Sequence, residues 1–191
     1  RAFNTAVKLA MPSLESSAKS LVRQWLTNSV EVNTIIFGDM RAELGLARPA
    51  QAMQNIVNTI AENTIVSHSM FTPSNNGNIR GDVSISCLQS DFSGVLSLSE
   101  ATYESNDFTV EWLKWLLLHG TETVVKGYHI TYDPDLIKKS RTRQAIMVEG
   151  GGYSIPSDFA GTPSDNFLTR ALTGIENEFG KILEREIVTR L

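Results

Sequence analysis

Residues 148–166, VEGGGYSIPSDFAGTPSDN, decide the fold class of this chain, because they lead from a predicted strand into the last helix. A phosphate-binding loop at Gly150-Gly151-Gly152 would need a helix directly after the glycines, with a Lys and a Ser or Thr at its start. The residues that follow, 153–156, are YSIP, which is extended in character. We therefore predict a turn or a flexible flap at the glycines, not a nucleotide loop.

The end of this stretch carries the clearest helix signal in the chain. Thr162 supplies a capping hydroxyl, Pro163 suits the first helical position, and Asp165 places an acid in the first turn. We predict a long closing helix over residues 163–190, held by packing because each of its two glycines costs roughly 1 kcal/mol of helix propensity. Its apolar stripe consists of Leu168, Leu172, Ile175, Phe179, Ile182 and Ile187.

Residues 1–71 are predicted to be helical, because apolar residues recur there at spacings of three and four. The first helix lies within residues 1–29, and Pro12 is a candidate start for it, since proline is tolerated in a first turn. A second helix over residues 30–46 ends at Gly45. A third opens at Pro49 and continues to residue 70, where the turn-forming segment 72–78 stops it.

The apolar period changes from 3.6 to 2 after residue 82. Alternation in residues 83–87 and again in residues 96–98, on either side of a turn, predicts an antiparallel hairpin over residues 82–100. A short apolar helix near residues 108–119 ends at Gly120. Short strands are predicted around residues 128–132 and 145–148.

This order of elements predicts a single α+β domain over residues 1–191. Its parts are N-terminal helices (1–71), a β-rich region with an antiparallel hairpin and short strands (82–161), and a long C-terminal helix (163–190).

Composition narrows the function classes. The chain has 191 residues, a formal net charge of −4 and one cysteine, Cys87, which excludes an internal disulfide and a Cys-rich zinc site. Its histidines have no metal-ligand spacing, and its longest apolar run, residues 115–118, is far shorter than the ~20 residues that span a bilayer. We expect a soluble protein of a reducing cytoplasm without metal, cofactor or membrane. Because the sequence begins at Arg1, we expect preceding residues to have been removed or left unnumbered.

An enzyme is one alternative. Its site would be a glycine-rich flap at residues 149–152 closing over Ser154, His129 and Asp158. No Gly-x-Ser-x-Gly elbow surrounds any serine, and acid pairs such as Asp133 and Asp135 suit a solvated loop. The sequence therefore favours a protein that is not an enzyme.

A nucleic-acid adaptor is a second alternative, based on the loop at residues 138–143. Lys138, Lys139, Arg141 and Arg143 are four cations within six residues. Such a cluster can meet phosphates, but no aromatic residues interleave the cations as a single-strand groove requires. An exposed connecting loop is the favoured interpretation.

Four segments of the C-terminal half resemble neck and tail-completion proteins of tailed bacteriophages, which include minor tail and head-tail connector proteins. The segments are EWLKWLLLHG at 111–120, SRTRQAIM at 140–147, YSIPSDFAGT at 153–162 and DNFLTRAL at 165–172. The resemblance covers roughly residues 108–190, and the order of elements is similar too.

The resemblance implies a structural virion protein that forms a ring, a hexamer being favoured over a dodecamer, without catalytic residues. Its neighbours would be neck, portal-adaptor, tail-terminator or sheath proteins, and it would be assembled in the host cytoplasm. DNA would pass through the lumen without specific binding, which suits a negative net charge. Core packing is favoured for the paired tryptophans, with an interface as the alternative. The candidate interface residues are Trp112, Trp115, Arg141, Arg143, Tyr153, Phe159, Asn166 and Arg170.

Overall fold

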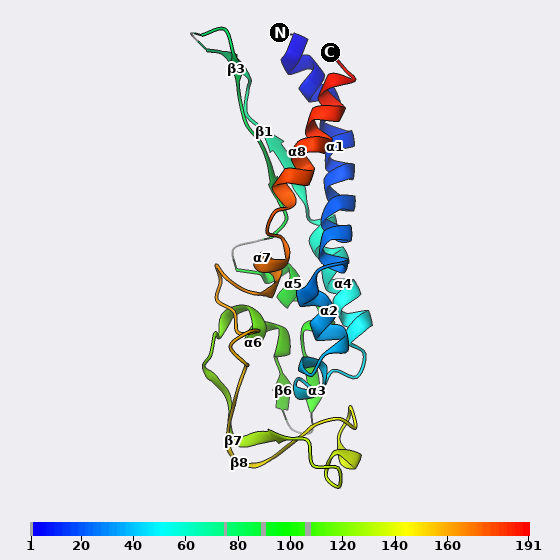
Figure 1. The fold of residues 1–191 in the computed structure, drawn as a ribbon, viewed down its shortest axis with the longest axis vertical. Helices are drawn as coiled ribbons and strands as arrows, with labels where there is room; N and C mark the ends of the chain where they lie inside the picture. The colour runs from blue at the N-terminus through cyan, green and yellow to red at the C-terminus, as the bar shows by residue number, and fades with distance from the viewer. Residues whose placement is uncertain (1, 75, 89–90, 106–107) are drawn as a thin grey trace.

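Helix α1 (Ala2–Thr27) runs along the long axis of the molecule and is its longest element, with 26 residues (Figure 1). Pro12 lies inside it, so the candidate helix start at Pro12 is wrong. An internal proline costs about 3 kcal/mol, and a buried apolar face that continues on both sides of it offsets this cost. That face consists of Ala6, Val7, Ala10, Leu14, Ala18, Val22 and Leu26.

Three further helices complete the N-terminal region of the computed structural model, which describes residues 2–74, 76–88, 91–105 and 108–191. They are α2 (Val30–Phe37), α3 (Met40–Glu43) and α4 (Pro49–Glu62). The predicted helix over residues 30–46 is thus two helices, separated at Gly38. Helix α4 begins at Pro49 as predicted but ends eight residues before residue 70.

A long antiparallel arm follows α4. It comprises β1 (Ile65–His68), β2 (Thr72–Pro73), β3 (Ile79–Arg80) and β4 (Val83–Ser86), with β1 paired to β4 and β2 to β3. We call these four strands the arm. The predicted hairpin over residues 82–100 is therefore wrong, because β4 pairs with β1, which lies before it in the sequence.

An asparagine at the start of α1 is hydrogen-bonded to the segment between β1 and β2 of the arm. The Asn4 side chain donates from Nδ2 to the Phe71 carbonyl (2.9 Å) and accepts at Oδ1 from the Phe71 amide (2.9 Å). The Phe71 ring also meets Phe3 edge-on, with 4.9 Å between ring centroids. Asn4 thus makes with the Phe71 backbone the two hydrogen bonds that a residue of a neighbouring strand would make.

Residues 91–101 are helical where a strand was predicted, as α5 (Ser93–Leu96) and the 3-10 turn η1 (Ser99–Ala101). Phe92, Val95 and Leu96 are spaced by three and four residues and pack on the core. The Ser93 amide donates to the Asp91 side chain at 3.0 Å. The apolar spacing here fits a helix as well as a strand, and packing selects the helix.

The β-rich region contains two more strand pairs around a short helix. Strands β5 (Tyr103–Ser105) and β6 (Phe108–Val110) form one pair, and α6 (Trp112–Leu118) follows. The predicted helix near residues 108–119 therefore starts later, and its first residues belong to β6. Strands β7 (Thr123–Thr131) and β8 (Ile146–Ser154) form the second pair, which we call the ribbon.

The glycine run lies inside β8 and not in a turn, so the turn prediction is wrong. Lys126 pairs with Gly152 and Tyr128 with Glu149, which leaves Gly150 and Gly151 in a bulge. Their φ values of 112° and 70° are in the region that favours glycine. Gly150 and Gly151 therefore allow β8 to form a bulge while it stays paired with β7 on both sides.

The closing segment forms two helices instead of one. Helix α7 (Phe167–Ala171) is followed by α8 (Ile175–Val188), and Gly174, with φ 87°, separates them. The predicted cap at Thr162 is wrong, because Thr162 closes a turn with Asp165 before α7 begins. The N-cap of α7 is a different residue, described below.

The fold is α+β, as predicted, and its described residues form two apolar cores. The smaller one joins residues 2–21 of α1, the arm and α8. We call these three parts together the stalk, and both termini lie at its end (Figure 1). The larger one fills the rest of the molecule, which we call the body, and the ribbon lies at the far end of the body from the stalk. Helix α1 contributes to both cores.

Candidate functional site

A cavity of about 700 Å³ lies between the ribbon and the body. Its volume is within the range of about 300–1,000 Å³ that is usual for ligand pockets. Side chains from α3, β5, β6, α6, both ribbon strands and the segment after η2 (Ile137–Lys139) line it. Its apolar part includes Val110, Trp115, Ile130 and Met147, and its charged residues are Glu43, Lys139 and Arg141.

Arg141 is held in a defined position at this cavity. Its guanidinium lies 4.0 Å from the centroid of the Tyr103 ring, and its Nη2 donates to the Glu104 carbonyl at 2.7 Å. Within the described part of the chain, neither Arg141 nor Lys139 forms an ion pair. Among the described residues, these two cations therefore have no ion-pair partner at the cavity.

Glu43 fastens both ends of the ribbon to α3. Tyr132, just after β7, donates its hydroxyl to Glu43 Oε1 at 2.7 Å, and Tyr153 of β8 donates to Oε2 at 3.0 Å. Burial, together with the Glu43 carboxylate, raises the pKa of both phenols well above its usual value. Both phenols are therefore held in the neutral, donating form, and the ribbon is tied down at two points.

A second constellation, outside the cavity, joins the ribbon to α7. Asn166 is fully buried and caps α7, since its Oδ1 accepts from the Leu168 and Thr169 amides at 3.1 Å each. The Asn166 amide donates in return to the Thr169 hydroxyl at 2.8 Å, which completes a capping box. A Cβ at Gly161 would collide with the Leu116 carbonyl, so only glycine fits there.

Arg170 closes the same joint. Its Nε donates to the Asp165 carboxylate at 2.7 Å, and its Nη1 and Nη2 donate to the carbonyls of Asp158 (2.9 Å) and Ala160 (2.7 Å). We call residues 158–170 the joint. All three guanidinium nitrogens are engaged within the chain, so Arg170 acts here as a structural tie.

The predicted interface residues fall in different places. Trp112 is 1% exposed and donates Nε1 to the Glu100 carbonyl at 2.8 Å, so the core interpretation is correct for it. Trp115 and Arg141 both line the cavity, and Tyr153 donates a hydrogen bond to Glu43, which also lines it. Of the remainder, Arg143 is exposed with φ 56°, Phe159 packs half-buried on the core, and Asn166 and Arg170 belong to the joint.

The catalytic alternative does not assemble. Ser154 pairs with Thr123 and His129 with Val148, so Ser154 and His129 are separated by several ribbon positions, on the order of 15–20 Å. His129 Nδ1 instead hydrogen-bonds the Gly150 carbonyl at 2.9 Å. No group of three His, Cys, Asp or Glu side chains suited to a metal ion occurs in the described ranges.

Sequence reasoning missed Glu43, Tyr103 and Tyr132. Glu43 meets Tyr132 and Tyr153 across separations of 89 and 110 residues, and nothing local to Glu43 signals this. The loop at residues 138–143 gave a usable signal, because two of its cations line the cavity. Lys138 instead forms an exposed pair with Asp135 at 3.0 Å.

Comparison with known proteins gives no relative from which a role could be taken. No protein-family model, no curated protein and no solved structure matches this chain. None of the helices in the described residues is both long and apolar enough to span a membrane.

Proposed function

We propose that this chain is a non-enzymatic structural subunit of a tailed bacteriophage, acting in the neck, head-tail connector or tail-completion ring. The observation that carries the proposal is the joint, which contains parts of two of the four resembling segments, 153–162 and 165–172. Gly161 admits the Leu116 carbonyl, Asn166 caps α7, and Arg170 ties the loop to the helix. Residues that hold two parts of a fold together are expected to recur wherever that fold recurs. The joint therefore supports a likeness in fold to the phage proteins, without a shared chemistry.

The distribution of elements along the axis also supports a ring subunit. The arm and both termini lie at one end of an elongated molecule and the ribbon lies at the other (Figure 1). A subunit of a layered ring needs contacts within its ring and with the layers on either side. Projecting β elements at both ends are suited to the second kind of contact.

The partners proposed are further copies of the chain, a hexamer being favoured, and adjacent neck, portal-adaptor, tail-terminator or sheath proteins. The chain would be located in the virion after assembly in the host cytoplasm. The net charge of −4 favours free passage of DNA over adhesion to it.

Size measurement tests this proposal directly. Mass photometry and negative-stain microscopy of the purified chain, alone and mixed with extracts of the phage that encodes it, should show rings and incorporation into particles. A strict monomer that never enters a particle would count decisively against the proposal.

Single-strand nucleic-acid binding is the second candidate, favoured by one observation. The cavity places Tyr103, Trp115 and Tyr128 beside Lys139 and Arg141, a combination of aromatics and cations that the sequence order conceals. Binding of a fluorescent oligo-dT should then weaken steeply with salt and with Arg141→Ala. Oligo-dT that stays unbound at low salt would exclude this role.

A further inference from the structure

We propose that the cavity between the ribbon and the body receives the loop at residues 133–136 of a second copy of this chain. The inference rests on the proposed ring and names the contact that would build it. It is carried by the chemistry of the cavity, the chemistry of the loop, and the positions of both along the molecule.

The cavity is suited to a segment that is both acidic and apolar. Its charged residues are Lys139, Arg141 and Glu43, so its lining has a net charge of +1 (two cations less one acid). Both Glu43 oxygens already accept hydroxyl groups, and Arg141 is positioned by Tyr103. Beneath these groups, half-buried apolar side chains such as Trp115 and Met147 remain partly open to solvent.

The loop at residues 133–136 has the matching chemistry. Asp133 and Asp135 carry its charge, and Leu136 is 38% exposed. The Asp135 side chain is 89% exposed, and its surface pair with Lys138 contributes little stability.

The loop is also pre-formed. Asp133 Oδ1 accepts from the Asp135 amide at 2.8 Å, and the Asp133 carbonyl accepts from the Leu136 and Ile137 amides at 3.1 and 3.0 Å. A segment that is already ordered loses less conformational entropy when it binds than a disordered one does.

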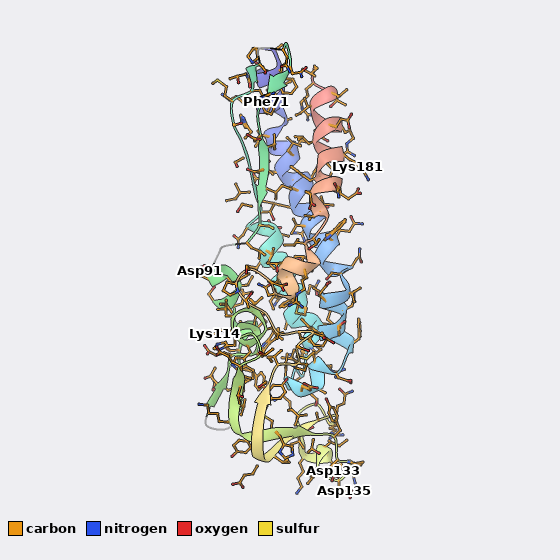
Figure 2. The ribbon with its side chains drawn as sticks, turned by 60° about the vertical axis from the view of Figure 1, so that its left-hand side comes forward. Phe71, Asp91, Lys114, Asp133, Asp135 and Lys181 are labelled. Carbon is orange, nitrogen blue, oxygen red and sulfur yellow. The ribbon has the colours of Figure 1, made fainter. Side chains whose placement is uncertain are left out.

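Position favours this loop over the acidic residues of the stalk. Asp133 and Asp135 lie at the tip of the ribbon end (Figure 2), and the cavity is lined by the ribbon itself. In a closed ring whose axis follows the long axis of the subunit, a repeated contact joins surfaces at the same height. Glu176, Glu178 and Glu184 belong to α8, in the stalk, and do not meet this condition (Figure 1).

The contact joins two different surfaces, the cavity of one copy and the loop of the next. The charge of each surface can therefore be reversed in a separate variant, and the two variants can then be mixed. The cavity variant is Lys139→Glu with Arg141→Glu. The loop variant is Asp133→Asn with Asp135→Lys, in which the asparagine amide keeps the oxygen that forms the turn. Each variant alone places like charges together, and we expect its self-association to weaken about tenfold or more. Mixed together, the two variants present complementary charges at every contact and should form rings of alternating copies.

A matched control reverses two cations in the stalk, Lys8→Glu with Arg80→Glu, and should leave rings intact. Circular dichroism on every variant separates loss of contact from loss of fold, and recovery on mixing shows that both chains are folded. Sedimentation velocity measures the assemblies.

Rings that persist in either folded variant, or a mixture that does not recover, would overturn the inference. So would a wild-type chain that does not self-associate at any concentration, whereas incorporation into particles decides the proposed function separately. Intact rings in the cavity variant together with loss of oligo-dT binding would assign the cavity to nucleic acid instead.

Discussion

The stalk and the body are stabilised in different ways. The body is held by a core of 25 buried apolar residues that draws on most of the elements outside the arm and α8. Of the described residues in the stalk, eight are buried, and only five of them form its core cluster. The stalk relies in addition on polar ties between its parts, such as Asn4 to Phe71 and the Ser13 hydroxyl to Glu186 at 2.7 Å. Regions with few buried apolar contacts open first. The comparison indicates a molecule that can lose the order of its stalk while its body stays folded.

The largest effect is expected for Trp112→Ala. Truncating a fully buried tryptophan removes packing and leaves a cavity, and typically costs about 3–5 kcal/mol. Because Trp112 lies in the core of the body, we expect the free energy of unfolding of the whole molecule to fall, as measured by urea denaturation followed by circular dichroism. Trp115→Ala, at a half-exposed position of the same helix, is the control and should cost clearly less. Equal losses in the two variants would contradict this account of the body.

Leu14→Ala tests the stalk with an equally buried residue. Leucine-to-alanine changes cost about 2–5 kcal/mol in well-packed cores, and we expect a value near the lower limit here because the apolar cluster that contains Leu14 is small. Hydrogen exchange should accelerate in α8 and the arm and remain slow in α6. If α6 accelerated to the same extent, the stalk and the body would be one cooperative unit and the comparison would fail.

Asn4→Ala should have a smaller and more local effect. It removes both hydrogen bonds to Phe71 from a partly exposed site, at about 1 kcal/mol per bond or less. Exchange should then increase in the arm alone, with the urea midpoint nearly unchanged. Thr5→Ala is not a suitable control because Thr5 has an interaction of its own; Lys8→Ala, one turn further along, is preferable. Unchanged exchange in the arm would show that the Phe3 ring suffices to hold Phe71.

The smallest effect is expected at the ribbon, and it is a change of stability with pH that appears only in alkali. The pKa of Tyr132 and of Tyr153 is raised in the folded chain, by burial and by Glu43, above the value of about 10 expected when unfolded. Their contribution to stability is therefore fully present below pH ~10 and is lost as pH rises further.

Absorbance at 295 nm should show a late group of phenols in the wild type. Tyr153→Phe should remove one of them, and Glu43→Gln should make the ribbon phenols titrate earlier because it removes the carboxylate charge. A titration curve that Glu43→Gln leaves unchanged would mean that Glu43 does not hold the ribbon.

Local signals in the sequence located many elements correctly. Pro49 begins α4, Gly45 and Gly120 have the positive φ of helix ends, and the alternation near residue 130 does belong to a strand. The class, α+β, followed from such signals because each depends on neighbouring residues only.

Signals that depend on distant partners failed. The alternation of Leu96 and Leu98 predicted a strand, whereas Phe92, Val95 and Leu96 have helical spacing, and packing on the core decided between the two. Thr162 and Asn166 are both good caps by residue type, and the burial of Asn166 in the joint selects it.

The same limit applies to the candidate site. Arg141 and Trp115 were named from the sequence, and both line the cavity. Glu43 was not named. Its partners are Tyr132, just after β7, and Tyr153 of β8, and the whole fold determines how these two strands pair and how they dock on α3. The cavity is defined by that docking.

The unbroken course of α1 has a mechanical consequence. A helix of 26 residues is about 39 Å long and behaves as a stiff rod. The chain enters the arm from α4 through residues 63–64, and it enters α8 from α7 at Gly174. A push or pull on the stalk end therefore reaches α2 and α4 along α1, while the arm and α8 can yield beside it. In a stacked assembly, such a subunit transmits axial load through one helix and adapts its contacts with the other two parts.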